Sequence, residues 1–210
     1  MKIKKFTFNS FQENTYVVSS KKKCMIIDPG CMNELEKNTL IEYIENNDLE
    51  PTELVNTHCH IDHIFGNNFI SKKYNLKAKI HEKDFELLKK SSEIAKLYNV
   101  DLEPPPLNVD FINEHDIIKI GDSQWEIIFT PGHAPGHICL LNNSHKKIIV
   151  GDVLFFMSIG RTDLPGCNHN DLINSIKDKL FILDDNIEVF PGHGQNTTIG
   201  FEKNNNPFFN

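Results

Sequence analysis

Polar and apolar residues alternate along many short segments of this chain, which is the pattern of half-buried β-strands. The expected strands are Ile3–Phe8, Thr15–Ser19, Cys24–Ile27, Glu53–Asn56, Ala78–Ile80, Ile117–Ile120, Trp125–Phe129, His137–Leu141, Lys147–Val150 and Ile187–Phe190. Five of them come before residue 100 and five after it. The pattern therefore predicts two halves of similar build.

Apolar residues at helical spacing predict helices between these strands. Leu40, Ile41 and Ile44 share one helix face, with Asn33 as the expected N-cap and Glu36 three residues later. The other expected helices carry Phe65, Phe69 and Ile70, then Phe85 and Leu88, and finally Leu172, Ile173, Ile176 and Leu180. Because strands and then helices occur twice, we expect an α/β (α+β) fold of two packed sheets with helices on their outer faces.

We expect a single domain, 1–210, whose halves are about 1–105 and 106–210. The segment 91–110 interrupts the pattern, since Pro104–Pro106 can neither continue a helix nor occupy a central strand. It is either a surface connection between the halves or a lid over a site.

Composition and charge exclude several classes of protein. The 210 residues include 22 Lys and Arg against 29 Asp and Glu, a net charge of −7 that disfavours nucleic-acid or anionic-lipid partners. No apolar run approaches the roughly 20 residues of a membrane helix, and Met1–Phe11 does not resemble a signal peptide. The five cysteines include no Cys-x-x-Cys pair, so we expect reduced thiols and a cytoplasmic location.

The chemistry is concentrated in the histidines. His58, His60, Asp62 and His63 place four potential metal ligands within six positions. In an extended segment His58 and His60 project to the same side, and Cys59 faces away as a small buried residue. Asp62 and His63 lie where the chain turns into the next helix and can reach back to the same space.

Three further candidate ligands follow strands of the second half. His133 and His193 each follow a Pro-Gly turn, and Asp152 follows Val150-Gly151. Loops at strand ends are where rigid scaffolds gather catalytic groups. With the cluster they make seven ligands, enough for two metal ions that share one carboxylate. Imidazole and carboxylate groups suit zinc, with iron or manganese as alternatives.

In order and rough spacing, these seven residues resemble the ligand set of the metallo-β-lactamase-fold hydrolases. The chain looks most like the short glyoxalase II-like members, through Gly151-Asp152-Val153-Leu154-Phe155, Gly160-Arg161-Thr162-Asp163 and Thr197-Thr198-Ile199-Gly200. The resemblance implies a four-layer αββα sandwich. It also implies that His58, His60 and His133 hold one metal ion, that Asp62, His63 and His193 hold a second, and that Asp152 bridges them. A bridging carboxylate argues against antibiotic hydrolysis.

The resemblance further implies a hydroxyacylglutathione hydrolase-like activity on S-lactoylglutathione or a related acyl thioester, a small-molecule substrate. A metal-bound hydroxide would attack the thioester carbonyl, with Asp62 and Asp152 as the catalytic carboxylates. Arg161 is either a substrate contact or a structural residue tied to Asp163. Only 17 residues follow His193, too few for the C-terminal helical region of full-length glyoxalase II, so we expect a more open thiol site. The oligomeric state is left open.

The sequence is compatible with three other interpretations. A persulfide dioxygenase shares the fold but uses a single iron held by two histidines and an aspartate. A nucleic-acid processing enzyme is disfavoured by the charge, and a metal-stabilised binding module needs only four ligands. For Asp28 and His137, hydrogen bonding to metal ligands and roles in a turn or on the surface are both open. His81, His115, His145 and His169 lack the context of ligands.

Overall fold

The computed structural model describes residues 1–209 and arranges most strands in two six-stranded sheets. The first sheet contains β1 (Lys2–Phe8), β2 (Glu13–Ser20), β3 (Lys23–Ile27), β4 (Glu50–Val55), β5 (Ala78–Ile80) and β6 (Asp110–Phe111), in that order. β1 to β3 are antiparallel, and β3 to β6 are parallel. The whole first sheet precedes the whole second sheet in the sequence.

The second sheet has the strand order β14-β13-β10-β9-β8-β7. Its strands are β7 (Ile117–Ile120), β8 (Ser123–Phe129), β9 (Ile138–Asn142), β10 (Lys147–Gly151), β13 (Glu188–Pro191) and β14 (Thr197–Thr198). All neighbours are antiparallel except β10 and β13, which are parallel. A separate hairpin joins β11 (Leu154–Phe155) to β12 (Ser158–Ile159).

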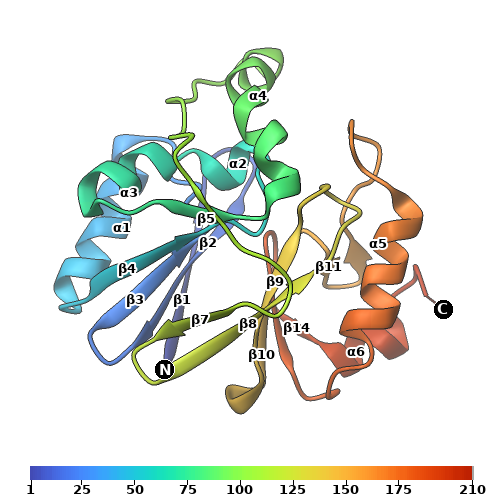
Figure 1. The fold of residues 1–210 in the computed structure, drawn as a ribbon. Coiled ribbons are helices and arrows are strands. Elements are labelled where there is room, and N and C mark those ends of the chain that lie inside the picture. The colour runs from blue at the N-terminus through green and yellow to red at the C-terminus, as the bar shows by residue number, and fades with distance from the viewer. Residues whose placement is uncertain (210) are drawn as a thin grey trace.

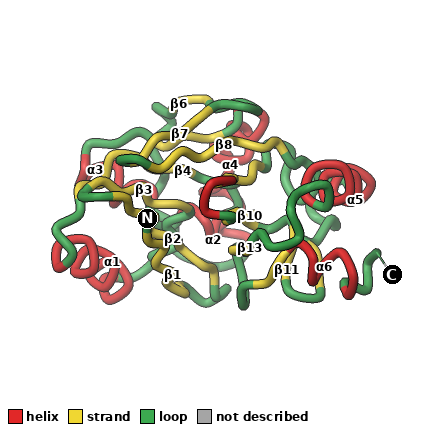
Figure 2. The backbone as a smooth tube through the Cα atoms, turned by 90° about the horizontal axis from the view of Figure 1, so that it is seen from below, coloured by secondary structure: helices red, strands yellow, loops and turns green. Residues whose placement is uncertain are grey.

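Helices lie outside both sheets, as Figures 1 and 2 show. Those of the first half are α1 (Glu34–Asn46), α2 (Ile61–Ile64), α3 (Asn67–Tyr74) and α4 (Phe85–Leu97), with a 3-10 turn η1 (Glu82–Asp84). Those of the second half are α5 (His169–Ser175), a π-helical turn η3 (Ile176–Leu180) and α6 (Ile199–Asn205), with a 3-10 turn η2 (Asn143–His145). The predicted αββα sandwich is confirmed.

Alternate residues of each central strand enter different layers of the core. In β3, Cys24 and Ile26 pack among the helices of the first half, whereas Met25 and Ile27 pack between the sheets. Trp125 lies in that central layer, fully buried. A third cluster joins the outer face of the second sheet to α5, η3 and α6. The period of two therefore produces three apolar layers from four layers of secondary structure.

The helix predictions agree in position, with three differences, of which the first is that Phe65 lies between α2 and α3 and not in one helix with Phe69 and Ile70. Asn33 and Glu36 form the expected capping box of α1. The helix around Leu172 changes at Ile176 into a π-helical turn, where the amide of Phe181 bonds the carbonyl of Ile176 at 2.8 Å. The short elements β6, β11, β12, β14 and α6 were not predicted, because two to seven residues carry too little periodicity.

The segment 91–110 is partly helical. Its first residues complete α4, which ends at Leu97, and the remainder runs irregularly to β6 with Pro105 buried. In the described residues 1–209, no helix combines the length and hydropathy needed to cross a membrane. The five cysteines are free, and four of them are buried. Free thiols do not establish a compartment, and the cytoplasmic location stays a prediction. The division of 1–210 into one domain of two similar halves also stays a prediction.

Candidate metal centre

The site lies where strands of both sheets end. His58, His60, Asp62 and His63 follow β4, and Asp28 follows the neighbouring β3. From the second sheet, His133 follows β8, Asp152 follows β10 and His193 follows β13. The main chain joins the two sheets here, since the amide of Ile138 donates to the carbonyl of Thr57 at 2.8 Å. All seven expected ligand residues therefore come together.

The His58–His63 segment has the predicted geometry. The rings of His58 and His60 lie 4.7 Å apart between centroids, and Cys59 points into the core of the first half with no exposed surface. The short helix α2 then carries Asp62 and His63. The prediction that Cys59 packs as a small apolar residue is confirmed.

Two glycines allow the second-sheet ligands to approach. Gly132 adopts a φ of +138°, and a Cβ there would lie 2.2 Å from the amide nitrogen of Leu172. A Cβ on Gly192 would lie 2.1 Å from Oδ1 of Asp152. Each position needs glycine because no side chain fits against α5 or against the carboxylate. The glycine of each Pro-Gly-His sequence, before His133 and before His193, is therefore a steric requirement.

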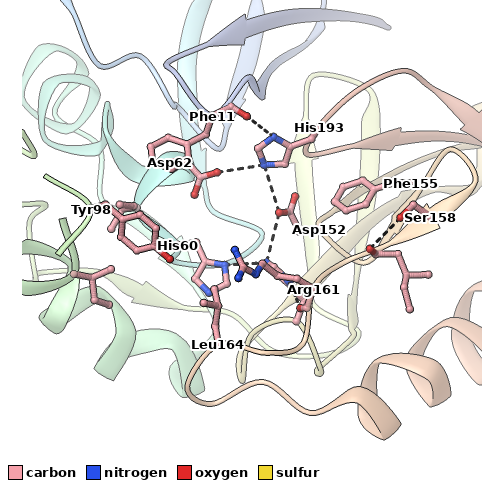
Figure 3. A pocket seen from close by; sticks show the side chains of 14 residues that line it. Phe11, His60, Asp62, Tyr98, Asp152, Phe155, Ser158, Arg161, Leu164 and His193 are labelled. Atoms are coloured by element: carbon pink, nitrogen blue, oxygen red, sulfur yellow. Dashed lines mark hydrogen bonds and ion pairs between the residues drawn. The ribbon is translucent and has the colours of Figure 1, made fainter. Parts of the chain in front are cut away.

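In the described residues, three overlapping groups of donor atoms lie within 4.8 Å of one another. Two of them are the expected ligand groups, His58, His60 and His133, and Asp62, His63 and His193, and the third is Asp28, His58 and His63. In the first group Nδ1 of His60 is 2.8 Å from Nε2 of His133. In the second, Nε2 of His193 is 3.2 Å from Oδ2 of Asp62 (Figure 3).

Asp152 lies between the two groups. Its Oδ1 is 3.4 Å from Nε2 of His63, and its Oδ2 is 3.5 Å from Nε2 of His133 and 3.4 Å from Nε2 of His193. In the described chain, Nε2 of His58 is buried without a hydrogen-bond partner, and Nε2 of His63 and Oδ1 of Asp152 are buried 3.4 Å apart without forming a hydrogen bond. Buried polar atoms are rarely left unpaired, so this donor set fits metal ions. The cluster has the form of a two-metal site.

Hydrogen bonds at Nδ1 orient three of the histidines. His63 faces Oδ2 of Asp28 at 3.1 Å, His133 donates to the carbonyl of Arg161 at 2.9 Å, and His193 faces the carbonyl of Phe11 at 3.1 Å. In each ring this directs Nε2 toward the centre of the cluster, as metal-binding histidines require.

The charges of the cluster are strongly coupled. Burial opposes ionisation of Asp152, but His63 and His193 outweigh it and hold the pKa of this carboxyl well below its usual value. Burial likewise opposes the charged form of His193, yet hydrogen bonds to Asp152 and Asp62 raise its pKa to about 9. Burial and the neighbouring His133 lower the pKa of His60 to about 3. Before a cation binds, protons on His63 and His193 balance the carboxylates.

Asp28 and His137 both serve the site rather than the surface. Asp28 is 1% exposed, and its carboxylate also accepts from the amide and hydroxyl of Thr57 at 2.7 and 2.6 Å. His137 is fully buried, and its Nε2 accepts from the amide of Asp152 at 3.1 Å. Both residues therefore fix the backbone that presents the cluster.

Arg161 has a structural and a potential functional role. Its guanidinium forms a two-pronged ion pair with Asp163 at 2.7 and 2.8 Å, and its side chain also lines the cavity over the cluster. The hydrogen bonds between the two side chains raise the pKa of Arg161 and lower that of Asp163 to about 2. Of the four histidines without a ligand context, His115, His145 and His169 are exposed and His81 caps η1.

Sequence reasoning missed three residues that support the site. Glu13 is fully buried, with Oε1 4.0 Å from Nδ1 of His63, and burial raises its pKa well above the usual value. Asp84 accepts from the amides of Cys59 and Gly136 at 2.8 and 2.5 Å and so joins two ligand loops. The side chain of Asn14 donates to the carbonyls at 191 and 194, on either side of His193. Only Glu13 had a signal in the sequence, as a carboxylate at the first position of the buried strand β2.

A cavity of about 410 Å³ opens over the cluster. Tyr98 and Phe155 stand on opposite sides of it, and His60, Asp152 and His193 face it (Figure 3). Phe11 and Leu164 also belong to its apolar lining. The donor atoms are therefore accessible to a small molecule, and Tyr98 from the 91–110 segment forms part of the wall.

Residues 9–193 match the family model described as "Metallo-beta-lactamase superfamily". The chain belongs to the metallo-beta-lactamase superfamily. It is 38% identical to the Haemophilus influenzae protein named "Hydroxyacylglutathione hydrolase GloC", with 100% of this chain and 99% of that relative covered. The family and this relative identify a metallo-hydrolase, and the relative's name implies a small-molecule substrate.

Two solved structures of superfamily members are also similar. BLEG-1, described as a B3 metallo-beta-lactamase, superposes with a TM-score of 0.86 at 31% identity and covers 99% of both chains. TTHA1623 in a di-iron-bound form gives a TM-score of 0.86 at 31% identity and covers 97% of this chain and 98% of its own. The fold is thus shared with proteins of different described activities, and it does not select the metal or the substrate.

Proposed function

We propose that this protein is a metal-dependent thioester hydrolase of the glyoxalase II type. In this proposal His58, His60 and His133 hold one metal ion, and Asp62, His63 and His193 hold the second. Asp152 bridges them, and the observation that carries this assignment is the contact of its two oxygens with histidines of both groups at 3.4 and 3.5 Å. The relative named as a hydroxyacylglutathione hydrolase supports the substrate class.

Zinc, or iron or manganese in its place, would supply a water molecule of lowered pKa and polarise a carbonyl oxygen. The chain's own residues hold and orient the reactants. Asp62 and Asp152 lie at the proposed metal sites, and their pKa values are lowered, which favours the ionised carboxylates. They can therefore accept hydrogen bonds from the attacking water and align it with the thioester carbon. A thiolate leaves readily because the pKa of its thiol is only about 8.5, so cleavage of the C–S bond requires no side-chain acid and the thiolate takes its proton from solvent.

Asp62, His63 and His193 favour the hydrolase over the persulfide dioxygenase. A mononuclear iron site needs only two histidines and one carboxylate. Here a second group of three donors is present, and its donor atoms lie within 4.8 Å of one another. The dioxygenase hypothesis predicts one iron per chain and oxygen uptake with glutathione persulfide.

The test is a substrate panel on metal-loaded protein. S-lactoylglutathione, acetyl-glutathione, a penicillin and glutathione persulfide are supplied separately, with metal content measured on the same sample. We expect thioester hydrolysis with two metal ions per chain. His133→Ala, which removes a proposed metal ligand, should lose this activity, and His145→Ala is its matched control because His145 is exposed on η2. Oxygen uptake with one iron, or penicillin hydrolysis without thioester hydrolysis, would overturn the proposal.

A further inference from the structure

A second cavity of about 510 Å³ adjoins the metal cavity. The two share the lining residues His60, Ile94, Tyr98 and Leu164, so they meet beside a proposed metal ligand. A molecule held at the cluster can therefore extend from the first cavity into the second without leaving the protein surface.

One wall of the second cavity is a face of α4. Leu87, Ile94 and Leu97 are seven and three residues apart and line it together, a spacing that places them on one side of a helix. The core-facing side of the same helix is a different stripe, of Leu88, Ser91 and Ala95. Leu87 packs in part against the core of the first half and Ile94 is half-buried, whereas Leu97 is 85% exposed, so α4 has a second apolar stripe that the core covers only in part. Large apolar surface left open beside a cleft is typical of a ligand groove.

The opposite wall is also apolar. It consists of Pro135, from the loop that carries His133, and of Leu164 and Pro165. The charged residues of the cavity are exposed, with Lys83 on η1 and Glu86 and Lys90 on α4. By contrast, Ser158 and Arg161 line only the metal cavity. A polar thiol carrier fits the side with Arg161 and Ser158, and an apolar group fits the side beyond Tyr98.

We propose that the groove between α4 and Pro135–Pro165 binds an unbranched apolar acyl chain of the thioester substrate. This inference rests on the proposed thioester hydrolysis and narrows its substrate class. The carbonyl lies at the cluster, the thiol carrier lies toward Arg161, and the acyl chain runs past Tyr98 along Leu87, Ile94 and Leu97.

The first experiment is a chain-length series of glutathione thioesters with acetyl, butyryl, hexanoyl and octanoyl groups. We expect kcat/KM to rise about threefold for each methylene that enters the groove, because burial removes it from water. A parallel series of acetyl thioesters with alkanethiols of increasing length places the chain on the sulfur side instead. If only this second series shows the rise, the groove binds the thiol carrier and the acyl assignment is wrong.

Variants locate the effect. In Leu97→Ser and Leu87→Ser the ratio of octanoyl to acetyl kcat/KM should fall by about tenfold, because a polar group replaces apolar contact. Leu35→Ser is the matched control, since Leu35 is 77% exposed on α1 and lines neither cavity. An unchanged ratio in both groove variants contradicts the proposal.

Binding of S-alkyl glutathione thioethers, measured by calorimetry, separates this inference from the proposed hydrolysis. These thioethers carry an alkyl chain but no scissile carbonyl. Affinity that rises from S-methyl to S-octyl and falls in Leu97→Ser supports the groove even if no thioester is cleaved. Equal affinity along the series, together with equal kcat/KM for all acyl groups, overturns the groove while leaving the hydrolase proposal intact.

Discussion

Oδ2 of Asp28 lies 3.1 Å from Nδ1 of His63 and 2.6 Å from the hydroxyl of Thr57. One buried oxygen thus fixes a proposed metal ligand and the residue before His58. Asp28 adopts a φ of +48°, a left-handed conformation that aspartate and asparagine tolerate better than most residues. The backbone at this turn and the orientation of His63 therefore depend on the same side chain.

Asp28→Asn should weaken metal binding by about 10- to 100-fold, the usual effect of losing a partner of a ligating histidine. Asparagine keeps the backbone and the volume, but its single amide oxygen cannot replace both Oδ1, which accepts from the amide of Thr57, and Oδ2, which faces the Thr57 hydroxyl and His63. Competition with a chromophoric chelator measures the affinity. Asp178→Asn, on the exposed side of η3, is the control, and equal affinities in the two variants would contradict the orienting role.

Asp152→Ala should reduce both metal content and turnover. The change removes the carboxylate that lies 3.4 and 3.5 Å from histidines of the two groups, so we expect at most one tightly held ion per chain. Elemental analysis after gel filtration measures this. If the variant retains two ions and full turnover, Asp152 does not bridge.

Arg161→Ala should leave metal affinity unchanged. The atom of Arg161 that accepts from Nδ1 of His133 at 2.9 Å is the main-chain oxygen, and alanine retains it. If the guanidinium contacts an anionic substrate, KM rises while metal content stays constant. A loss of metal in this variant would instead show that the ion pair with Asp163 holds the loop in place.

Metal binding should release protons at pH 7. The pKa of His193 is raised to about 9 and that of His63 is also raised, so both are charged at pH 7 in the metal-free protein and must lose a proton to ligate. Apparent affinity should therefore increase with pH through the raised pKa of His193, about 9. Calorimetric titration with zinc in buffers of different protonation enthalpy counts the protons, and His193→Gln should release fewer. Heats that do not depend on the buffer at pH 7 would refute the assignment.

Asp84→Asn should lower the free energy of unfolding by about 1–3 kcal/mol, since one of two buried amide donors loses its acceptor. Asp84 is fully buried and joins the loops of Cys59 and Gly136. Urea denaturation of the metal-free protein measures the change, with Asp101→Asn as the exposed control. Equal midpoints for the two variants would show that this link contributes nothing.

The ligand residues could be predicted because their signals are local. The alternation of His58 and His60 and the Pro-Gly turns before His133 and His193 depend on neighbours in the sequence. The partners of these ligands could not, because Asp28 is 35 positions from His63 and Asp84 is 52 from Gly136. Nothing in a single sequence records such a tertiary contact.

The groove shows the same limit. The spacing of Leu87, Ile94 and Leu97 predicts an apolar helix face, but only the folded chain shows that the fully buried face is that of Leu88 and Ala95. Two apolar stripes on one helix cannot be ranked from periodicity alone. The role of Pro165 opposite α4 depends on a loop that no local pattern indicates.

The seven donor side chains are divided between the sheets, four from the first and three from the second. Each of the two ligand groups includes residues from both halves, so neither half of the polypeptide, produced alone, possesses a complete group. Metal ions bound by donors of both sheets would hold the two sheets together at this end. Their dissociation rate would then report how often the sheets separate. Substitutions at the buried interface around Trp125, far from any catalytic group, should consequently be detected first as faster loss of metal.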